Sequence, residues 1–269
     1  MHSVAQTLAV LQISDIHLLK EAYHKMLGIN TEYYFLEVLR QAFSEGTHYD
    51  VLLLTGDLVQ DACEKSYQRL SQHLQFLPIP VICLPGNHDN VALMEQSLNS
   101  GNVSCQKQYL IHNWQIISLN SQIPKGPGGY LEEDELIMLE DYLSNNPQYL
   151  TIVAVHHHCT LTHSEWMDTM IIGNRERFLN LLARYPQVKL VIHGHIHQEL
   201  EERIDNLLIL GAPSTCFQFT PKSYNFSLDQ TAPGYREIRF YADGHIESTV
   251  KRLPNDLYEL NLNEPGYAD

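Results

Sequence analysis

Residue types that bind metal ions recur in five short clusters along this chain, each at the point where a run of apolar, β-prone residues stops. In chain order the clusters contain Asp15 and His17; Asp57; Asn87, His88 and Asp89; His156, His157 and His158; and His193, His195 and His197. In open α/β sheets ligands bind just beyond the carboxyl ends of the strands, so residues placed there by different strands meet in space. The pattern therefore predicts one site assembled from distant segments.

The spacing inside the clusters supports this convergence. A single isoleucine separates Asp15 from His17, and another separates His195 from His197. Residues i and i+2 of an extended segment point the same way, so we expect each pair to present two ligands to one small region. A residue without Cβ allows a tight turn and a close backbone approach. Such a residue precedes ligand-type residues at three places: Gly56, Gly86 and Gly194.

The number and type of the donors favour a site for two metal ions. The donors are Asp15, His17, Asp57, Asn87, His156, His195 and His197, which are too many for one tetrahedral ion. Imidazole and carboxylate ligands without thiolates suit iron, manganese or zinc rather than a calcium site or an iron–sulfur cluster. A carboxylate can bridge two ions about 3.5–4 Å apart, and a bridging water or hydroxide then attacks a phosphoester. The chemistry predicted is metal-dependent phosphoester hydrolysis.

Composition and charge narrow the class of protein. The 269 residues are 44% hydrophobic and 18% charged, as in globular proteins, and are enough for a substantial core. The formal net charge of −15 disfavours nucleic acid as a partner, and a small anionic substrate would need local cations such as bound metals. Five cysteines without a CxxC pair, no basic leader and no long apolar run indicate a cytoplasmic protein that has no membrane partner.

Short apolar runs alternate with amphipathic stretches, which is typical of a layered α/β fold. We expect strands at Leu8–Ile13, Val51–Leu54, Val81–Leu84, Trp114–Leu119, Leu150–Val155 and Lys189–Ile192. We expect helices from a cap at Asn30 to Gly46, and at Asp61–Leu77, Glu132–Leu143 and Asn174–Tyr185. Hairpins are expected at Leu200–Leu210 and Tyr235–Val250, the second turning at Asp243-Gly244. Because no linker or repeat divides the chain, residues 1–269 are expected to form a single domain that includes the hairpin region of about 200–250.

The ordered motifs D-x-H, G-D, G-N-H-D, H and G-H-x-H, which span Asp15 to His197, resemble the pattern of calcineurin-like metallophosphoesterases. The segment from Ala212-Pro-Ser-Thr-Cys-Phe-Gln-Phe-Thr-Pro through Ala232-Pro-Gly-Tyr235 further resembles bacterial class III 3′,5′-cyclic AMP phosphodiesterases. The resemblance implies an α/β fold built as a four-layer αββα sandwich. It also implies a hydrolase that converts 3′,5′-cyclic AMP to 5′-AMP by attack of a metal-bound hydroxide.

Carried over residue by residue, the resemblance implies a role for each candidate. Metal 1 would be held by Asp15, His17, Asp57 and His197. Metal 2 would be held by Asp57, Asn87, His156 and His195, which makes Asp57 the bridge. His88 would contact the phosphate and protonate the departing oxygen. The substrate would contact His17, Asp57, Asn87, His88, His156 and His197, and the metals would be Fe²⁺ or Mn²⁺, with Zn²⁺ also compatible.

The chain departs from the family pattern at one ligand position. Where many relatives have His-His-x-Pro, it has His156-His157-His158-Cys159. The choice of ligand is therefore open among three histidines, with residue order favouring His156. We interpret His157 and His158 as flanking the site, and Cys159 as a thiol that does not coordinate metal. His193 is interpreted as a strand residue of the core or of the surroundings of the site.

Other residues have weaker motif contexts. Asp89 either caps the following helix or orients His88. The Gly126–Gly129 loop either shapes the rim of a cleft or forms a plain turn. Arg175, Arg177 and Lys189 are interpreted as surface residues rather than phosphate ligands. The remaining histidines are expected to be structural or solvated: His2, His24, His48, His73, His112, His163 and His245.

Two alternative functions remain open. The first is a metallophosphoesterase that acts on other phosphodiesters, such as 2′,3′-cyclic nucleotides or glycerophosphodiesters, or on phosphomonoesters. The second is a non-catalytic metal-binding scaffold, against which the complete ligand set and His88 argue. A protein serine/threonine phosphatase is disfavoured because Leu-Val-Gln-Asp-Ala follows Asp57, without the acidic-Arg-Gly continuation of that branch. The sequence does not indicate an oligomeric state.

Overall fold

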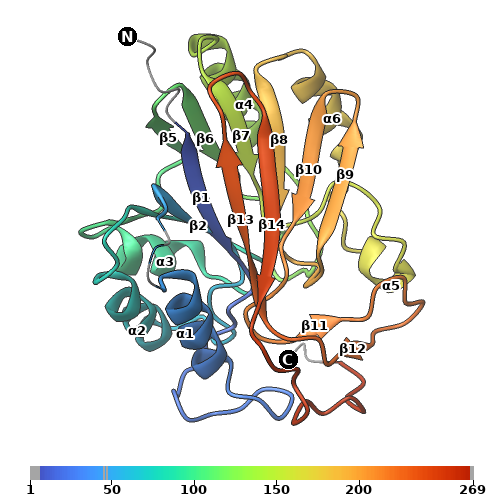
Figure 1. Cartoon of the computed structure of the whole chain (residues 1–269). Helices are drawn as coiled ribbons and strands as arrows, with labels where there is room; N and C mark the ends of the chain where they lie inside the picture. Colours follow the sequence, from blue (N-terminus) through green and yellow to red (C-terminus); the bar gives the residue numbers. More distant parts are fainter. Residues whose placement is uncertain (1–6, 45, 47, 267–269) are drawn as a thin grey trace.

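Two mixed β-sheets lie face to face in the structure, a computed structural model that describes residues 7–44, 46 and 48–266 (Figure 1). The first sheet has the strand order β14 (Ile246–Arg252), β13 (Gly234–Phe240), β1 (Leu8–Ile13), β2 (Val51–Thr55), β3 (Val81–Leu84) and β4 (Val103–Ser104). The second has the order β5 (Gln108–Ile111), β6 (Trp114–Ser118), β7 (Leu150–Ala154), β8 (Val188–His193), β10 (Leu207–Gly211) and β9 (Leu200–Ile204). The short strands β11 (Gln218–Phe219) and β12 (Leu228–Asp229) pair with each other.

Helices cover the outer faces of both sheets (Figure 1). Those on the first sheet are α1 (Thr31–Ala42), α2 (Glu64–Leu74) and α3 (Val91–Leu98), and those on the second are α4 (Glu133–Asn145) and α6 (Arg175–Ala183). The short helix α5 (Glu165–Asp168) lies at the same end of the molecule as β11 and β12. Three apolar cores fill the spaces from helix to sheet, sheet to sheet and sheet to helix. The structure thus confirms the four-layer αββα sandwich.

Strand β2 illustrates why the central strands are apolar throughout. Val51 and Leu53 pack between the two sheets, whereas Leu52 and Leu54 pack under the helices of the first sheet. A strand covered on both faces buries every side chain, so it reads as a continuous apolar run rather than an alternating one. Each fully buried aliphatic side chain contributes about 1.5–3 kcal/mol of apolar transfer free energy. These strands are therefore rigid supports for the residues that follow them.

The parallel strands of each sheet end at a common level. In the first sheet Ile13 of β1 pairs with Leu54 of β2, which is one residue from the end of that strand. In the second sheet Ala154, the last residue of β7, pairs with Ile192, one residue before the end of β8. The residues that follow these strands therefore start from the same edge of each sheet.

Helix α6 is slightly shorter than the sequence predicts, and α1 and α2 are markedly shorter. The side chain of Asn30 caps α1 by accepting a bond from Tyr33 N at 2.8 Å, as expected, but α1 ends before Gly46. The helix predicted at Asp61–Leu77 is also too long, because Asp61 instead accepts a bond from Lys20 N at 2.7 Å and belongs to the preceding loop. These differences concern helix ends, where local side-chain bonds compete with helical ones.

Glu32 joins helices α1 and α2. Its carboxylate accepts hydrogen bonds from Arg69 Nε at 2.8 Å and from His73 Nε2 at 2.7 Å. Burial raises the pKa of Glu32, but the bonds and charges of His73 and Arg69 outweigh burial and hold the pKa below its usual value. His73 was expected to be either structural or solvated, and this bond gives it a structural role.

Both predicted hairpins are present, and each extends a sheet. β13 pairs antiparallel with β1 in the first sheet, and β10 pairs parallel with β8 in the second. The turn between β13 and β14 passes through Asp243 and Gly244, where Gly244 has a φ of 89°. The helix expected after Asp89 is present as α3, whereas α5 and the short strands β4, β5, β11 and β12 were not predicted. Of the helices in the described residues, none has the length and hydropathy required to cross a bilayer.

Candidate metal centre

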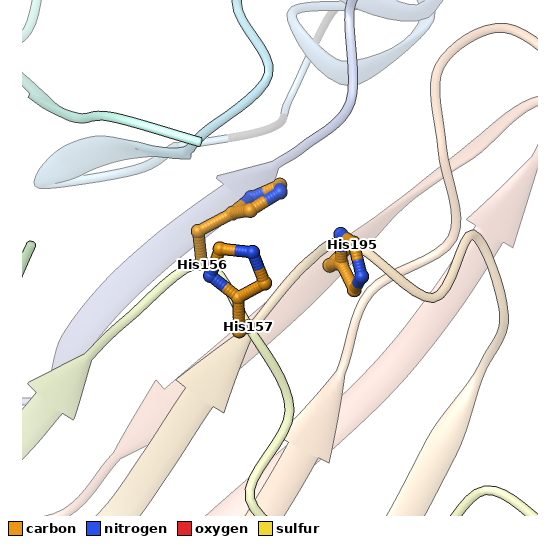
Figure 2. Close-up of side chains that lie close together, drawn as sticks. All are labelled: His156, His157 and His195. Atoms are coloured by element: carbon orange, nitrogen blue, oxygen red, sulfur yellow. The ribbon is translucent and has the colours of Figure 1, made fainter. Parts of the chain in front are cut away.

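The predicted metal-binding residues, which come from both sheets, lie together at one end of the sandwich. They follow β1 (Asp15 and His17), β2 (Asp57), β3 (Asn87 and His88), β7 (His156) and β8 (His195 and His197). Within each of four groups, potential ligand atoms lie within 4.8 Å of one another: Asp15, His17 and His197; Asp15, Asp57 and His156; His17, Asp57 and His88; and His156, His157 and His195. The members of these four groups are buried, except the half-buried His88, and Asn87 is half-buried as well. Figure 2 shows the rings of His156, His157 and His195 gathered beyond the ends of β7 and β8.

Asp15 and His17, and likewise His195 and His197, were expected in an extended segment. Their backbone is instead left-handed, so that expectation was wrong. Both pairs lie past the last strand residue, and their φ angles are 54° for Asp15, 49° for His17, 65° for His195 and 46° for His197. Asp57 has a φ of 49°. A non-glycine residue in this left-handed region costs about 1–3 kcal/mol. Other contacts must offset that cost, and one of them is the bond from His195 N to both carboxylate oxygens of Asp15, at 3.0 and 3.1 Å.

The three glycines do allow the close approach that the sequence predicts. A Cβ added to Gly86 would lie 2.2 Å from Asp57 Oδ1, and one added to Gly194 would lie 1.8 Å from Ser14 Oγ. A Cβ on Gly56 would lie 2.3 Å from the Nδ1 atom of His156. Contacts this short are not compatible with a side chain, so glycine is required for the loops to pack against each other.

Three of the histidines are oriented by bonds from their Nδ1 atoms to oxygen acceptors. The pairs are His17 with Gln60 Oε1 at 2.9 Å, His156 with Thr55 O at 2.8 Å, and His197 with Phe217 O at 2.8 Å. Because these oxygens only accept, each Nδ1 carries the proton. In the neutral ring the Nε2 atom is then left with a lone pair, which is the form that binds metal.

The Nε2 atoms of His17 and His197 lie 3.2 Å apart. In the form that binds metal, with the proton on Nδ1, each ring directs an Nε2 lone pair into the same small space. These two lone pairs repel unless a cation lies between them. Asp15 supplies a carboxylate oxygen 3.4 Å from His197 Nε2. This donor set fits a divalent metal ion.

Asp57 has one oxygen fixed by the protein and one that is not. Its Oδ1 accepts a bond from His88 N at 2.9 Å. Its Oδ2 is buried and has no hydrogen-bond partner among the described residues, although it lies 3.3 Å from His156 Nε2 and 3.7 Å from His17 Nε2. Burying a carboxylate oxygen is costly unless cations offset its charge. Its position between two histidines fits an oxygen that bridges two cations.

The buried charges favour the protonation states that metal ligands need. Burial raises the pKa of Asp57, but His156 and His88 outweigh burial and hold it well below its usual range. Burial lowers the pKa of His17 to about 3 and that of His195 well below its usual value, so both rings are neutral. Burial also lowers the pKa of His156, but the Asp57 carboxylate outweighs this effect and raises the pKa to about 9. A metal ion binding His156 must therefore displace a proton.

The residues beside His156 have other partners, which supports the interpretation that they flank the site. The Nδ1 atom of His157 accepts a bond from Ser121 Oγ at 2.7 Å, and its Nε2 donates to Pro127 O at 3.2 Å. His158 Nε2 lies 3.5 Å from an Asp168 carboxylate oxygen. Burial raises the pKa of the Cys159 thiol to about 12, which keeps this group protonated.

Asp89 has neither of the two roles considered from the sequence. The cap of α3 is Asn90, whose side chain accepts a bond from Leu93 N at 3.1 Å. The Asp89 carboxylate instead accepts bonds from Gly86 N at 2.9 Å, Leu58 N at 3.1 Å and Tyr67 Oη at 2.9 Å. It therefore fixes the loops that follow β2 and β3.

The remaining sequence expectations concern residues away from the centre. Arg177 on α6 pairs with Glu133 of α4, and Lys189 Nζ donates to Pro186 O at 2.8 Å. Arg175 is the first residue of α6 and is half-buried. The histidines at the surface are His24, His48, His112, His163 and His245. His193 is buried, with Nδ1 donating to Gly194 O at 3.0 Å, and His2 lies outside the described residues.

Two supports of the centre had no signal in the sequence beyond the family resemblance. Gln60, which orients His17, follows Asp57 in a loop that is not distinctive in composition. The segment between β10 and β11 supports the other side, because Ser214 Oγ donates to Asp15 O at 2.8 Å. Phe219 stacks on the ring of His197, with 4.3 Å between centroids. None of these three contacts follows from spacing, since each depends on how distant loops meet.

A cleft of about 710 Å³ opens at the candidate residues Asn87, His88 and His195. Its walls also include Trp166, Met170 and Phe226. Gly126 and its neighbours Lys125 and Pro127 line it as well, so the glycine-containing loop does shape the cleft. The arrangement offers buried metal-type ligands at one side and space for a small organic molecule beside them.

This fold and this cluster define a metal-dependent phosphoesterase. A model of the calcineurin-like phosphoesterase family matches residues 8–199, the stretch that contains every candidate ligand. The chain belongs to this family, as its motifs predicted. It is 38% identical to a 3′,5′-cyclic adenosine monophosphate phosphodiesterase CpdA of Haemophilus influenzae, over 96% of this chain and 94% of that protein. It is 39% identical to a 3′,5′-cyclic-nucleotide phosphodiesterase of Nostoc, over 93% of this chain and 94% of that protein.

Solved structures with the same fold are more distant in sequence. A dimetal phosphatase from Danio rerio has a TM-score of 0.61 and 13% identity, and the match covers 91% of this chain and 98% of that chain. GAP50 of Plasmodium, an anchor in the inner membrane complex, also has a TM-score of 0.61, with 12% identity and coverage of 98% and 91%. At such identities the likeness shows the fold alone.

Proposed function

We propose that this protein is a two-metal phosphodiesterase that hydrolyses 3′,5′-cyclic AMP to 5′-AMP. The observation that carries the proposal is the buried Asp57 Oδ2, which lacks a hydrogen-bond partner among the described residues and lies between His17 and His156. The substrate is supported by the relatives of 38% and 39% identity, whose names specify cyclic-nucleotide phosphodiesterases.

The distances support two ligand sets that share one carboxylate. Metal 1 would be held by Asp15, His17, Asp57 and His197, and metal 2 by Asp57, Asn87, His156 and His195. The second set is supported by Asn87 Oδ1, which lies 3.2 Å from His156 Nε2, and by His195, whose ring nitrogens are buried without hydrogen-bond partners among the described residues. Imidazole, carboxylate and amide ligands suit Fe²⁺ or Mn²⁺, and Zn²⁺ is also compatible.

The bound ions would lower the pKa of an attacking water and offset charge on the phosphoryl oxygens. His88 would supply the proton for the leaving group. It is half-buried, lines the cleft, and has its backbone fixed by the bond to Asp57. Its imidazolium would bind a phosphate oxygen and protonate the O3′ atom as the bond from phosphorus to O3′ breaks. Because O3′ remains part of the ribose, the product is one molecule of 5′-AMP.

The chain itself supplies little positive charge to the cleft. Among the described residues that line it, Lys125 is the only lysine or arginine. The protein has a formal net charge of −15, so as a whole it would repel an anionic substrate. This balance supports a mechanism in which substrate binding requires the metal ions.

A substrate panel tests the proposal. Protein stripped with a chelator and reloaded with Mn²⁺ or Fe²⁺ is incubated with 3′,5′-cyclic AMP, and 5′-AMP is followed by chromatography. Faster turnover of 2′,3′-cyclic AMP, a glycerophosphodiester or a phosphomonoester would replace the proposed substrate. Failure to take up any transition metal would instead favour a non-catalytic scaffold that kept the fold and lost the chemistry.

We further propose that the chain acts as a single domain in the cytoplasm. Its five cysteines are free, which suits a reducing compartment. One cooperative unfolding transition, seen alike by circular dichroism and by fluorescence, is expected of a single domain. Recovery of the native protein in a periplasmic fraction would contradict the proposed compartment.

A further inference from the structure

The cleft beside the candidate metal centre has an aromatic wall that the ligand sets do not use. Trp166 on α5 lies 5.0 Å from Phe219 and 5.3 Å from Phe226 between ring centroids, with interplanar angles of 90° and 72°. Phe219 in turn stacks on the candidate ligand His197 at 4.3 Å. The aromatic side chains thus continue from the metal centre to the wall of the cleft, where Met170 lies beside them.

Several bonds hold this wall in place. Asp168, the last residue of α5, accepts bonds from the Thr162 amide and hydroxyl, both at 2.8 Å, and from His163 N at 3.0 Å. The segment that carries Phe226 is tied to the same region by the bond from Ser223 N to Ser164 Oγ at 3.2 Å. Because both segments are anchored by their own bonds, the wall is formed before a ligand binds. A preformed apolar surface lowers the entropic cost of binding a flat ring.

The chemistry of the cleft indicates what this wall contacts. A phosphate at the metal centre would occupy only a small part of a cleft of about 710 Å³. The wall itself carries no charge, so it suits an uncharged, flat group rather than a second anion. A purine has apolar faces that stack on aromatic side chains, and such stacking typically changes affinity by roughly five- to 150-fold.

We propose that Trp166, together with Met170 and Phe226, forms the surface that binds the nucleobase of the cyclic nucleotide. The inference rests on the proposed function, and it makes Trp166 a specificity-determining residue. The wall contributes to KM for substrates that carry a base. It does not take part in activating water or in protonating the leaving oxygen.

Kinetics with two substrates test this proposal. The first is 3′,5′-cyclic AMP, and the second is the corresponding 1-deoxyribose 3′,5′-cyclic phosphate, which lacks a base. For Trp166→Ala we expect KM for cyclic AMP to rise about tenfold, so that the preference for cyclic AMP over the base-free compound falls by the same factor. Trp166→Phe, which keeps a ring, should lose less. Tyr224→Ala is the matched control, because Tyr224 is an exposed aromatic residue near Phe226 that does not line the cleft.

Tryptophan fluorescence gives a second measurement that does not need turnover. The chain has two tryptophans, and Trp114 is buried between the sheets at 0% exposure. A phosphorothioate analogue of cyclic AMP that resists hydrolysis should quench the emission of Trp166. Quenching should persist in Trp114→Phe and disappear in Trp166→Phe.

The outcomes separate this inference from the function on which it rests. If the wild type hydrolyses cyclic AMP but Trp166→Ala keeps the same preference, and the analogue quenches only Trp114, the nucleobase surface is wrong while the proposed function stands. If the metal-loaded wild type hydrolyses neither cyclic phosphate, the proposed function fails and the inference fails with it.

Discussion

Replacing Gln60 by leucine should weaken metal binding without touching a metal ligand. The bond from His17 Nδ1 to Gln60 Oε1 is 2.9 Å long and partly buried, and it holds the proton of His17 on Nδ1. Loss of this acceptor leaves the His17 Nδ1–H group without that bond, which costs about 1–3 kcal/mol in the form of His17 that binds metal. Alternatively the ring places its proton on Nε2, where it competes with the metal. Since 1.4 kcal/mol is about a factor of ten, we expect a metal dissociation constant about tenfold higher, within the typical range for such supports.

Competition with a fluorescent chelator measures this constant, and elemental analysis gives the number of bound ions. Gln60→Glu keeps an acceptor for Nδ1 and should bind metal at least as tightly as the wild type. Gln68→Leu is a matched control, because Gln68 is exposed on α2 and its side chain donates to Glu64 Oε1 at 2.7 Å, away from the centre. Metal binding by Gln60→Leu that equals that of the wild type would refute the view that this bond sets the form of His17.

Three further outcomes are expected. Asn87→Ala should lose one of two ions and its activity, whereas His88→Ala should keep both ions and lower kcat by about 100-fold or more. Elemental analysis counts the ions and steady-state kinetics gives kcat. Normal rates in both variants would reject the assignment. Gly86→Ala places a Cβ 2.2 Å from Asp57 Oδ1, so the free energy of unfolding in urea should fall by about 1–3 kcal/mol; an unchanged midpoint would mean that the loop moves aside. Glu32→Gln should cost about 1.5–3 kcal/mol at pH 7. The pKa of Glu32 lies below its usual 4.5. The extra stability of the wild type should therefore be complete above pH 4.5 and disappear as the pH falls through the lowered pKa. Urea denaturation at pH 7 and near pH 3 tests this, and a stability difference independent of pH would argue against the ion pairs.

The parts of the fold that the sequence predicted are those with a strong local cause. Val81–Leu84 is a strand with the predicted bounds, since it is apolar on both faces and ends at prolines. Asn30 is the predicted cap because a β-region residue with a short amide side chain satisfies the first helical N–H groups. The strands β4 and β12 have two residues each, and so carry no periodicity to detect.

The candidate site was predictable in composition but not in conformation. Ligand types at strand ends identified Asp15 and His197, yet the left-handed backbone at both positions depends on contacts between loops of different sheets. The same reason hides Gln60 and the Phe217 carbonyl, because any residue has a carbonyl and only the folded chain selects which one meets a histidine. A sequence lists the donors, whereas the tertiary packing decides their protonation.

The division of the ligand cluster between two sheets has a consequence for how the protein becomes active. Asp15, Asp57 and Asn87 come from the first half of the chain, and His156 and His197 from the second. Neither half-chain contains all the proposed ligands of either metal ion, so the centre can be completed only after the two halves have docked. Metal uptake would then be a late event that links the two halves, and on the proposed ligand sets a nascent chain could not complete the centre before His197 had been synthesised.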